Sequence, residues 1–273
     1  NELYAAGFFD SAGGIPAKYI AKWNGNSWNT LGSGTGLNNI ANVMCIYNDN
    51  LIVGGWFTSV DGEMASSIAS WDGARWSSMN IGMNGPVYAL KVYNGELYAG
   101  GNFILAGTQT CNGIAKWDGN NWNSIGLGAA GSDKTIYTLE VYNNELYAGG
   151  IFIKMDNIFC YNLAKYNGIS WSSLGGGATG ANCFVSQGYL TSLKVFNNEL
   201  YAAGLFTKMN GVTANKLSKF DGVSWCSLEY GVDLRRRSME VYNNQLIING
   251  DFYSASGVVS NNIVSYKPPK ILT

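Results

Sequence analysis

Short runs in which apolar and polar side chains alternate recur along the whole chain, separated by clusters of Gly, Asn, Asp and Ser. Residues 87–93 (VYALKVY) and 96–103 (ELYAGGNF) are two such runs. Alternation with a period of two is the pattern of half-buried strands, and the chain shows no 3.6-residue helical period. Asn94-Gly95 between the two runs favours a tight type I′ hairpin, because both residues tolerate positive φ. The pattern predicts an all-β chain of short antiparallel strands.

These runs belong to a repeat that covers the chain. A phrase close to N-x-x-L-Y-A-G-G-x-F recurs at intervals of 46 to 54 residues. An aromatic residue follows its Leu by 20 positions in every copy, and in five copies a Trp stands five residues later. We therefore expect four strands in each unit, here called A to D. In the third unit they are residues 87–93, 96–103, 114–117 and a strand that begins at Trp122.

Four-stranded units of this length are typical of a β-propeller, whereas a solenoid has shorter, flatter repeats with caps. The sequence predicts a single six-bladed propeller domain over residues 1–273 with incomplete terminal blades. The first unit lacks strand A, which residues upstream of Asn1 would supply unless that blade is three-stranded, and the last unit ends in a stub after Tyr266. The units are about 1–47, 48–93, 94–142, 143–196, 197–242 and 243–273.

The glycine pair and the spaced aromatic residues, such as Gly100-Gly101 with Trp117 and Trp122, resemble the kelch type of propeller repeat. The fuller phrase G-G-x-F-T-x-x-x-G at residues 54–62 is similar to repeats of bacterial secreted proteins and of fungal cortical polarity marker proteins. This resemblance implies a surface or secreted interaction module and carries over no catalytic residue. It favours an extracellular or cell-surface location over a cytoplasmic one. The Asn- and Tyr-rich composition looks like that of AT-rich genomes, including those of large DNA viruses, so a virion surface is a further candidate location.

The composition excludes several kinds of chemistry. The 273 residues include no histidine, which excludes Ser-His-Asp and Cys-His catalysis and His-ligated metal sites. A net charge of −1 without a long basic stripe argues against nucleic acid or an anionic membrane as the partner. No apolar run is long enough for a transmembrane segment. We expect no enzyme, cofactor or metal, and a His-independent glycoside-active enzyme is the remote alternative.

Strand parity places all the long connections, B to C and D to A, on one face, here called the long-connection face. Loops on a rigid scaffold commonly carry binding residues, so we expect the site there. The residue x of GG-x-F points toward this face and varies while its neighbours repeat. Trp56, the one tryptophan outside the repeat pairs, is the main candidate. The other candidates at this position are Phe8, Asn102 and Asp251.

Two further groups are candidates for binding or cross-linking. Arg235, Arg236 and Arg237, before the last strand A, can hold a carboxylate, sulfate or phosphate, or form a solvated loop. Cys160 and Cys183 lie in long connections of one unit and are a candidate disulfide.

Two residue types in the repeat have expected packing roles. The glycine pair is expected to leave room for neighbouring large side chains, such as the repeat Trp, to lie close against the backbone. The lysine that precedes the strand C aromatic is expected to lay its stem over these glycines.

The sequence thus predicts a non-catalytic binding or structural scaffold module. Its long-connection face would bind a protein surface or attach the module to a surface. Higher-order assembly of the module is part of this prediction. A lectin-like module that binds a glycan is the alternative, although the differing x residues count against identical sugar sites.

Overall fold

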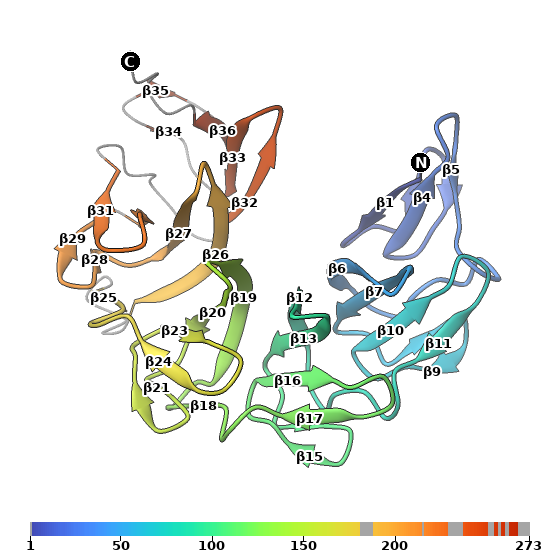
Figure 1. Ribbon diagram of the computed structural model, residues 1–273. Coiled ribbons are helices and arrows are strands. Elements are labelled where there is room, and N and C mark those ends of the chain that lie inside the picture. The colour runs from blue at the N-terminus through green and yellow to red at the C-terminus, as the bar shows by residue number, and fades with distance from the viewer. Residues whose placement is uncertain are drawn as a thin grey trace. The chain divides into compact units, whose positions relative to one another are not determined.

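The computed structural model describes residues 2–180, 188–214, 216–228, 237–250, 254–255, 258–259 and 262–266. All regular elements among these residues are β-strands, which confirms the predicted all-β class (Figure 1). The chain forms two compact units. Unit 1 contains residues 1–129 and 134–136, and unit 2 contains residues 130–133 and 137–273.

Unit 1 holds the first three antiparallel sheets of the described residues, here called blades 1 to 3. Each runs in chain order from strand A at one edge to strand D at the other, except that blade 1 has only B, C and D. The strands are β1 (Leu3–Ala6), β4 (Ile20–Trp23) and β5 (Trp28–Asn29); β6 (Ala41–Tyr47), β7 (Asn50–Gly55), β10 (Ile68–Trp71) and β11 (Trp76–Ser78); β12 (Val87–Tyr93), β13 (Glu96–Gly101), β16 (Ile114–Trp117) and β17 (Trp122–Ser124).

Unit 2 holds blades 4 to 6, apart from the first two residues of β19. Blades 4 and 5 have four strands, and the described part of blade 6 has A, B and C. The strands are β19 (Thr135–Tyr142), β20 (Glu145–Ile151), β23 (Leu163–Tyr166) and β24 (Trp171–Ser173); β26 (Tyr189–Phe196), β27 (Glu199–Leu205), β30 (Leu217–Phe220) and β31 (Trp225–Ser227); β32 (Arg237–Tyr242), β33 (Gln245–Gly250) and β36 (Ile263–Tyr266).

The tight turns follow the sequence prediction. Asn94 and Gly95 both have positive φ, 49° and 78°, as a type I′ hairpin requires. Trp117 and Trp122 are paired across β16 and β17 with ring centroids 5.1 Å apart. Between them the Asp118 side chain accepts hydrogen bonds from the backbone N–H groups of Asn120 and Asn121. Local signals therefore fix both short connections of a blade.

The sequence pattern had indicated that the long B-to-C connections are loops. The structure shows that they are not simple loops. Each contains a hairpin of two short strands, which places backbone hydrogen bonds where the sequence shows no alternation. The hairpins are β2 (Ser11–Ala12) with β3 (Ile15–Pro16), β8 (Ser59–Val60) with β9 (Glu63–Met64), β14 (Leu105–Ala106) with β15 (Gln109–Thr110), β21 (Lys154–Met155) with β22 (Ile158–Phe159), β28 (Lys208–Met209) with β29 (Val212–Thr213), and β34 (Ser254–Ala255) with β35 (Val258–Val259).

Within each unit, the described D-to-A connections join one blade to the B-to-C hairpin of the next. Two of these connections contain short strands, β18 (Ala129–Ala130) and β25 (Ala178–Thr179). Ala178 of β25 pairs with Met209 of β28. In unit 1, isolated bridges join Leu37 to Val60 and Met83 to Ala106. Each bridge ties the backbones of neighbouring blades together on the long-connection face.

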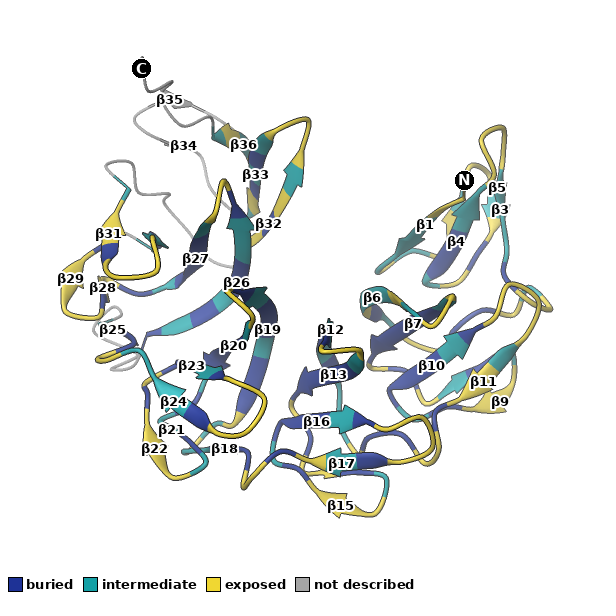
Figure 2. Cartoon of the chain, viewed as in Figure 1, coloured by how far each residue is buried: buried dark blue, intermediate teal, exposed yellow. Residues whose placement is uncertain are grey.

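The hydrophobic cores lie between neighbouring blades. One core packs Ile52 and Ile68 of blade 2 against Val87 and Leu97 of blade 3, and unit 2 has matching cores. Figure 2 shows buried residues concentrated on the strands and exposed residues on the turns and hairpins.

The first glycine of the pair leaves room for a neighbouring side chain, as expected, but that side chain is not the repeat Trp. A Cβ at Gly54 would lie 2.6 Å from Val87 Cγ1, so the first glycine admits strand A of the next blade rather than the repeat Trp. A Cβ at Gly55 would lie 2.2 Å from the carbonyl oxygen of Ile40. The second glycine therefore admits backbone of its own blade.

Candidate functional site

The x residues end strand B on the long-connection face with a shared backbone arrangement. The N–H of Trp56 donates to the carbonyl of Ile40 at 2.8 Å, and the N–H of Asn102 donates to that of Pro86 at 2.9 Å. Both acceptors directly precede strand A of the same blade. The backbone thus repeats while the side chains differ, so each blade presents a different group at the same place.

The x side chains of unit 1 are exposed but supported by neighbours. Trp56 is 48% exposed and meets the ring of Tyr88 edge-on, with centroids 6.1 Å apart. Asn102 donates from Nδ2 to Thr135 Oγ1 at 2.8 Å. Phe8 is 82% exposed, and its ring centroid lies 6.1 Å from that of Tyr19. The structure therefore brings together Trp56 and Tyr88, a partner that the sequence pattern did not identify.

Tyr88 occupies a bulge at the start of strand A. The pairing of β12 with β13 shifts between Val87 and Ala89, so Tyr88 is the extra residue. Asn42 has the same place in β6, and its Nδ2 donates to the carbonyl of Val87 in the next blade at 3.0 Å. A bulge that turns a side chain out of the ladder is a common device near binding sites. Aromatic residues at this repeat position are the signal that could have found Tyr88.

Several predicted site residues lie outside the described residues: Arg235, Arg236, Asp251 and Cys183. Arg237 begins β32 rather than lying in a loop, and its side chain is outside the described part. Cys160 is buried, with Sγ 4.0 Å from the carbonyl oxygen of Ile153. The arginine site and the disulfide remain predictions.

A pocket of about 280 Å³ lies on the long-connection face between blades 1 and 2. Asp10, Lys18 and Tyr19 line it from blade 1, and residues 35–38 and Ser59 line its other sides. No sequence signal marked it, because its walls come from three segments that are separate in the chain.

Hydrogen bonds hold the walls of this pocket together. The Asp61 carboxylate accepts from the backbone N–H of Ser33 at 2.6 Å and of Gly36 at 3.1 Å. Asn38 Oδ1 accepts from the N–H of Thr58 at 2.8 Å and of Ser59 at 3.1 Å. These bonds fix the D-to-A connection against the β8–β9 hairpin, so the pocket is preformed.

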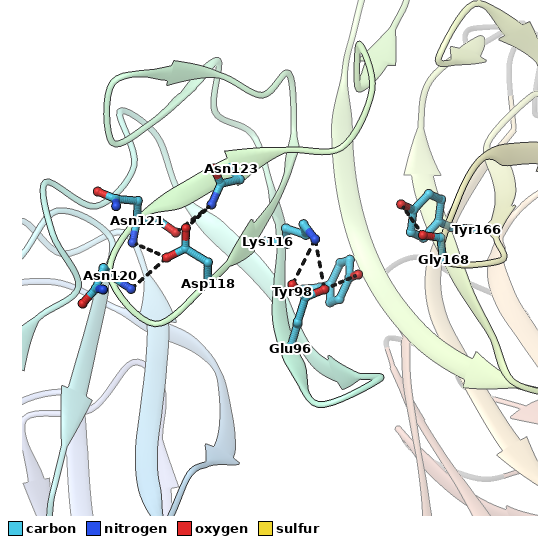
Figure 3. A network of polar contacts seen from close by, with 9 residues as sticks. All are labelled: Glu96, Tyr98, Lys116, Asp118, Asn120, Asn121, Asn123, Tyr166 and Gly168. Carbon is cyan, nitrogen blue, oxygen red and sulfur yellow. Dashed lines mark hydrogen bonds and ion pairs between the residues drawn. The ribbon is translucent and has the colours of Figure 1, made fainter.

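A second polar network repeats in four blades and therefore belongs to the scaffold (Figure 3). Lys116 Nζ lies 2.9 Å from Glu96 Oε1, and the hydroxyl of Tyr98 donates to the same carboxylate at 3.3 Å. In blade 5 the Glu199 carboxylate raises the pKa of Lys219 through the equivalent contact. Lys116 is paired with Tyr98 in the register and its ammonium reaches Glu96, at the end of strand B away from the glycines, which corrects that expectation. The other ion pairs of this kind are Lys22–Glu2, Lys165–Glu145 and Lys219–Glu199.

The described residues contain no group of three His, Cys, Asp or Glu placed to hold a metal ion. Within the same part of the chain, no helix is long and apolar enough to span a bilayer.

Comparison with known families identifies the repeat. The sequence model of the Rax2 C-terminal beta propeller domain matches residues 1–145, more than half of the chain. The chain belongs to the Rax2 C-terminal β-propeller family. Its antiparallel sheets are therefore propeller blades, which confirms the predicted β-propeller class; the number of blades and the single domain stay predictions. No curated protein sequence matches this Rax2-family chain.

Three solved structures with similar folds are the following. The extracellular domain of the putative hybrid two component system BT4673 from B. thetaiotaomicron has a TM-score of 0.56 at 12% identity, over 92% of this chain and 31% of that one. YCF48 bound to D1 peptide scores 0.51 at 13%, over 93% and 73%. YjhT scores 0.50 at 12%, over 91% of each. The Rax2-family chain thus spans about a third of the BT4673 domain, and these likenesses show the fold alone.

Proposed function

We propose that this propeller is a non-catalytic binding module that holds a protein partner on its long-connection face, with Trp56 at the centre of the contact. The observation that carries this proposal is the exposed Trp56 ring supported by Tyr88. Eight of the nine tryptophans belong to repeat pairs, so packing of the blades does not account for Trp56. Trp and Tyr are the residues that most often dominate the energy of protein interfaces.

The fold is compatible with such a role. YCF48, which has a similar fold, is described as bound to a D1 peptide. The likeness is one of fold, and a fold alone does not carry a function. The chemistry of Trp56 and Tyr88 therefore supports the proposal, and the likeness only agrees with it.

The proposal also covers the location of the module and its type of repeat. We place it at the cell surface, where it would assemble on a surface, and we assign its repeats to the kelch type. The absence of histidine and the Rax2 family assignment support a binding role over catalysis.

A photo-crosslinker tests the position of the contact. p-Benzoylphenylalanine is placed at position 56, and as a matched control at position 46, in cells that make the native protein. Ile46 is 59% exposed on the same blade but lies beside the A-to-B turn, on the other face. We expect a discrete cross-linked protein from position 56 alone, identified by mass spectrometry.

The identified partner then allows a quantitative test. Trp56→Ala is expected to weaken its binding about tenfold or more, because truncating an interface hot spot commonly costs more than about 1.4 kcal/mol. Equal cross-linking at both positions, or an unchanged Kd for Trp56→Ala, contradicts the proposal.

A further inference from the structure

The pocket between blades 1 and 2 carries a chemistry that the repeat does not require. At the equivalent junction of blades 2 and 3, Thr58, Ser66 and Ser67 take the places of Asp10, Lys18 and Tyr19. The backbone there is the same, since the N–H of Leu37 donates to the Lys18 carbonyl as that of Met83 donates to the Ser66 carbonyl. A scaffold role would repeat its side chains along with its backbone.

Tyr19 also occupies a backbone conformation that a tyrosine rarely adopts. Its φ is 64°, and the residue at this place has positive φ in all six blades. Gly or Asn, which tolerate this region, stand here in three blades: Gly113, Asn162 and Asn262. A bulky residue with positive φ is an outlier that deserves a functional explanation. In blade 1 this residue is aromatic and lines the pocket; its ring centroid lies 6.1 Å from that of Phe8, and it also packs against the hydrophobic core of blades 1 and 2.

The charged side chains on the pocket wall are not used by the scaffold. Neither Asp10 nor Lys18 has an ion-pair partner among the described residues, and within that part of the chain the Asp10 carboxylate accepts only from the neighbouring Ser11 hydroxyl at 3.1 Å. Asp10 would repel an anionic ligand and Lys18 would repel a cationic one. A ligand with a single charge therefore faces one like charge in either case. A neutral ligand with several hydroxyls can donate to the carboxylate and accept from the ammonium.

We propose that the Asp10–Lys18–Tyr19 pocket binds a neutral sugar, as one monosaccharide or the terminal residue of a glycan. Tyr19 lines the pocket beside the two charged residues and can offer an aromatic face to a sugar ring, and Thr35 and Ser59 are among the other lining residues. The volume of about 280 Å³ is at the small end of ligand pockets, which commonly measure about 300 to 1,000 Å³. It therefore suits one ring rather than a peptide segment. The site is separate from Trp56 and does not depend on the proposed protein contact.

Saturation-transfer NMR of the whole chain with a panel of neutral hexoses and N-acetylhexosamines tests this site. We expect signal from at least one sugar at about 10 mM, a concentration that detects millimolar affinity. Asp10→Ala is expected to lower the affinity about tenfold, because hydrogen bonds to a charged group are among the stronger ones. Glu63→Ala is the matched control, since Glu63 is an exposed acid on the adjacent hairpin that does not line the pocket.

A second variant keeps the test valid if the first changes the pocket shape. Tyr19→Asn removes the ring but suits the positive φ, as Asn162 does in blade 4, and is expected to abolish binding with the fold retained by circular dichroism. No signal from any neutral sugar, or unchanged binding in both pocket variants, overturns the proposal. Signal from free amino acids without sugars also overturns it, because the ligand class would then be a zwitterion. Cross-linking at position 56 reports on the protein contact independently.

Discussion

At the residue scale, the two glycines of the repeat have different duties. The second glycine is present in all six blades, whereas the first is Ala6, Ala203 or Asn249 in three of them. A Cβ at Gly101 would lie 2.2 Å from the carbonyl oxygen of Pro86, and backbone cannot move away cheaply. A Cβ at Gly100 would lie 2.7 Å from Ile136 Cγ2, which is the end of a side chain. In blades 2, 3 and 5 a Cβ at the second glycine would meet a backbone carbonyl oxygen, which explains why glycine stands there, whereas Gly7 of blade 1 has open space around this position.

Alanine at these two positions should therefore differ in cost. We expect Gly101→Ala to lower the free energy of unfolding by about 3 kcal/mol and Gly100→Ala by about 1 kcal/mol, the range found for overpacked sites. Urea unfolding of both variants at one temperature measures the difference. An equal or reversed order would show that the Pro86 carbonyl does not limit the second position.

At the scale of the element, the Glu-Tyr-Lys group behaves as a unit of strands B and C. Four blades have all three residues, and two blades lack all three. Blade 2 has Asn50, Ile52 and Ser70 in their places, and blade 6 has Gln245, Ile247 and Ser265. Because Tyr98 is opposite Lys116 in the register and Glu96 reaches both, losing one member removes a polar contact from the others.

A double-mutant cycle on blade 3 tests this coupling. The side chains of Lys116 and Glu96 are 32% and 36% exposed, so solvent screens the pair and its worth is at most about 1 kcal/mol. We expect Glu96→Gln with Lys116→Met to cost about 0.5 kcal/mol less than the sum of the single changes in urea unfolding. The coupling should shrink in high salt. Additive costs would mean that the pair contributes nothing to stability.

At the scale of the whole molecule, the cysteines report on packing in both units. Burial raises the pKa of the Cys45 thiol to about 12, of Cys111 to about 11 and of Cys160 to about 12. Cys226 is exposed. The thiolate is the reactive form, so the buried thiols should be inert near neutral pH while the blades remain packed.

Alkylation of the native protein with iodoacetamide at about pH 8 should therefore label Cys226 and spare Cys45, Cys111 and Cys160, since pH 8 is far below the raised pKa values. Peptide mass spectrometry reads the result. Labelling of Cys111 as fast as Cys226 would contradict the packed core between blades 2 and 3. In urea without reductant, labelling of all five cysteines would contradict a Cys160–Cys183 disulfide.

The candidate site was predictable in part. Trp56 stood out because the repeat explains every other tryptophan, and the structure places it exposed at the end of strand B. Tyr88 was missed because a bulge re-aims it, and a bulge leaves no mark in a pattern of period two. The sugar pocket was missed because Asp10, Lys18 and Ser59 come together only when blade 1 packs on blade 2.

The strands of the blades, the type I′ hairpins and the aromatic pairs were predictable from the sequence, since alternation and positive-φ residues act between near neighbours and recur from blade to blade. Only the tertiary structure decided what the long connections do. The Leu37–Val60 bridge and the pocket beside it depend on contacts between segments that are separate in the chain. Backbone groups make the bridge, and the side chains of Asp61 and Asn38 bond to backbone more than 19 residues away, so a local pattern of apolar and polar positions does not encode these contacts.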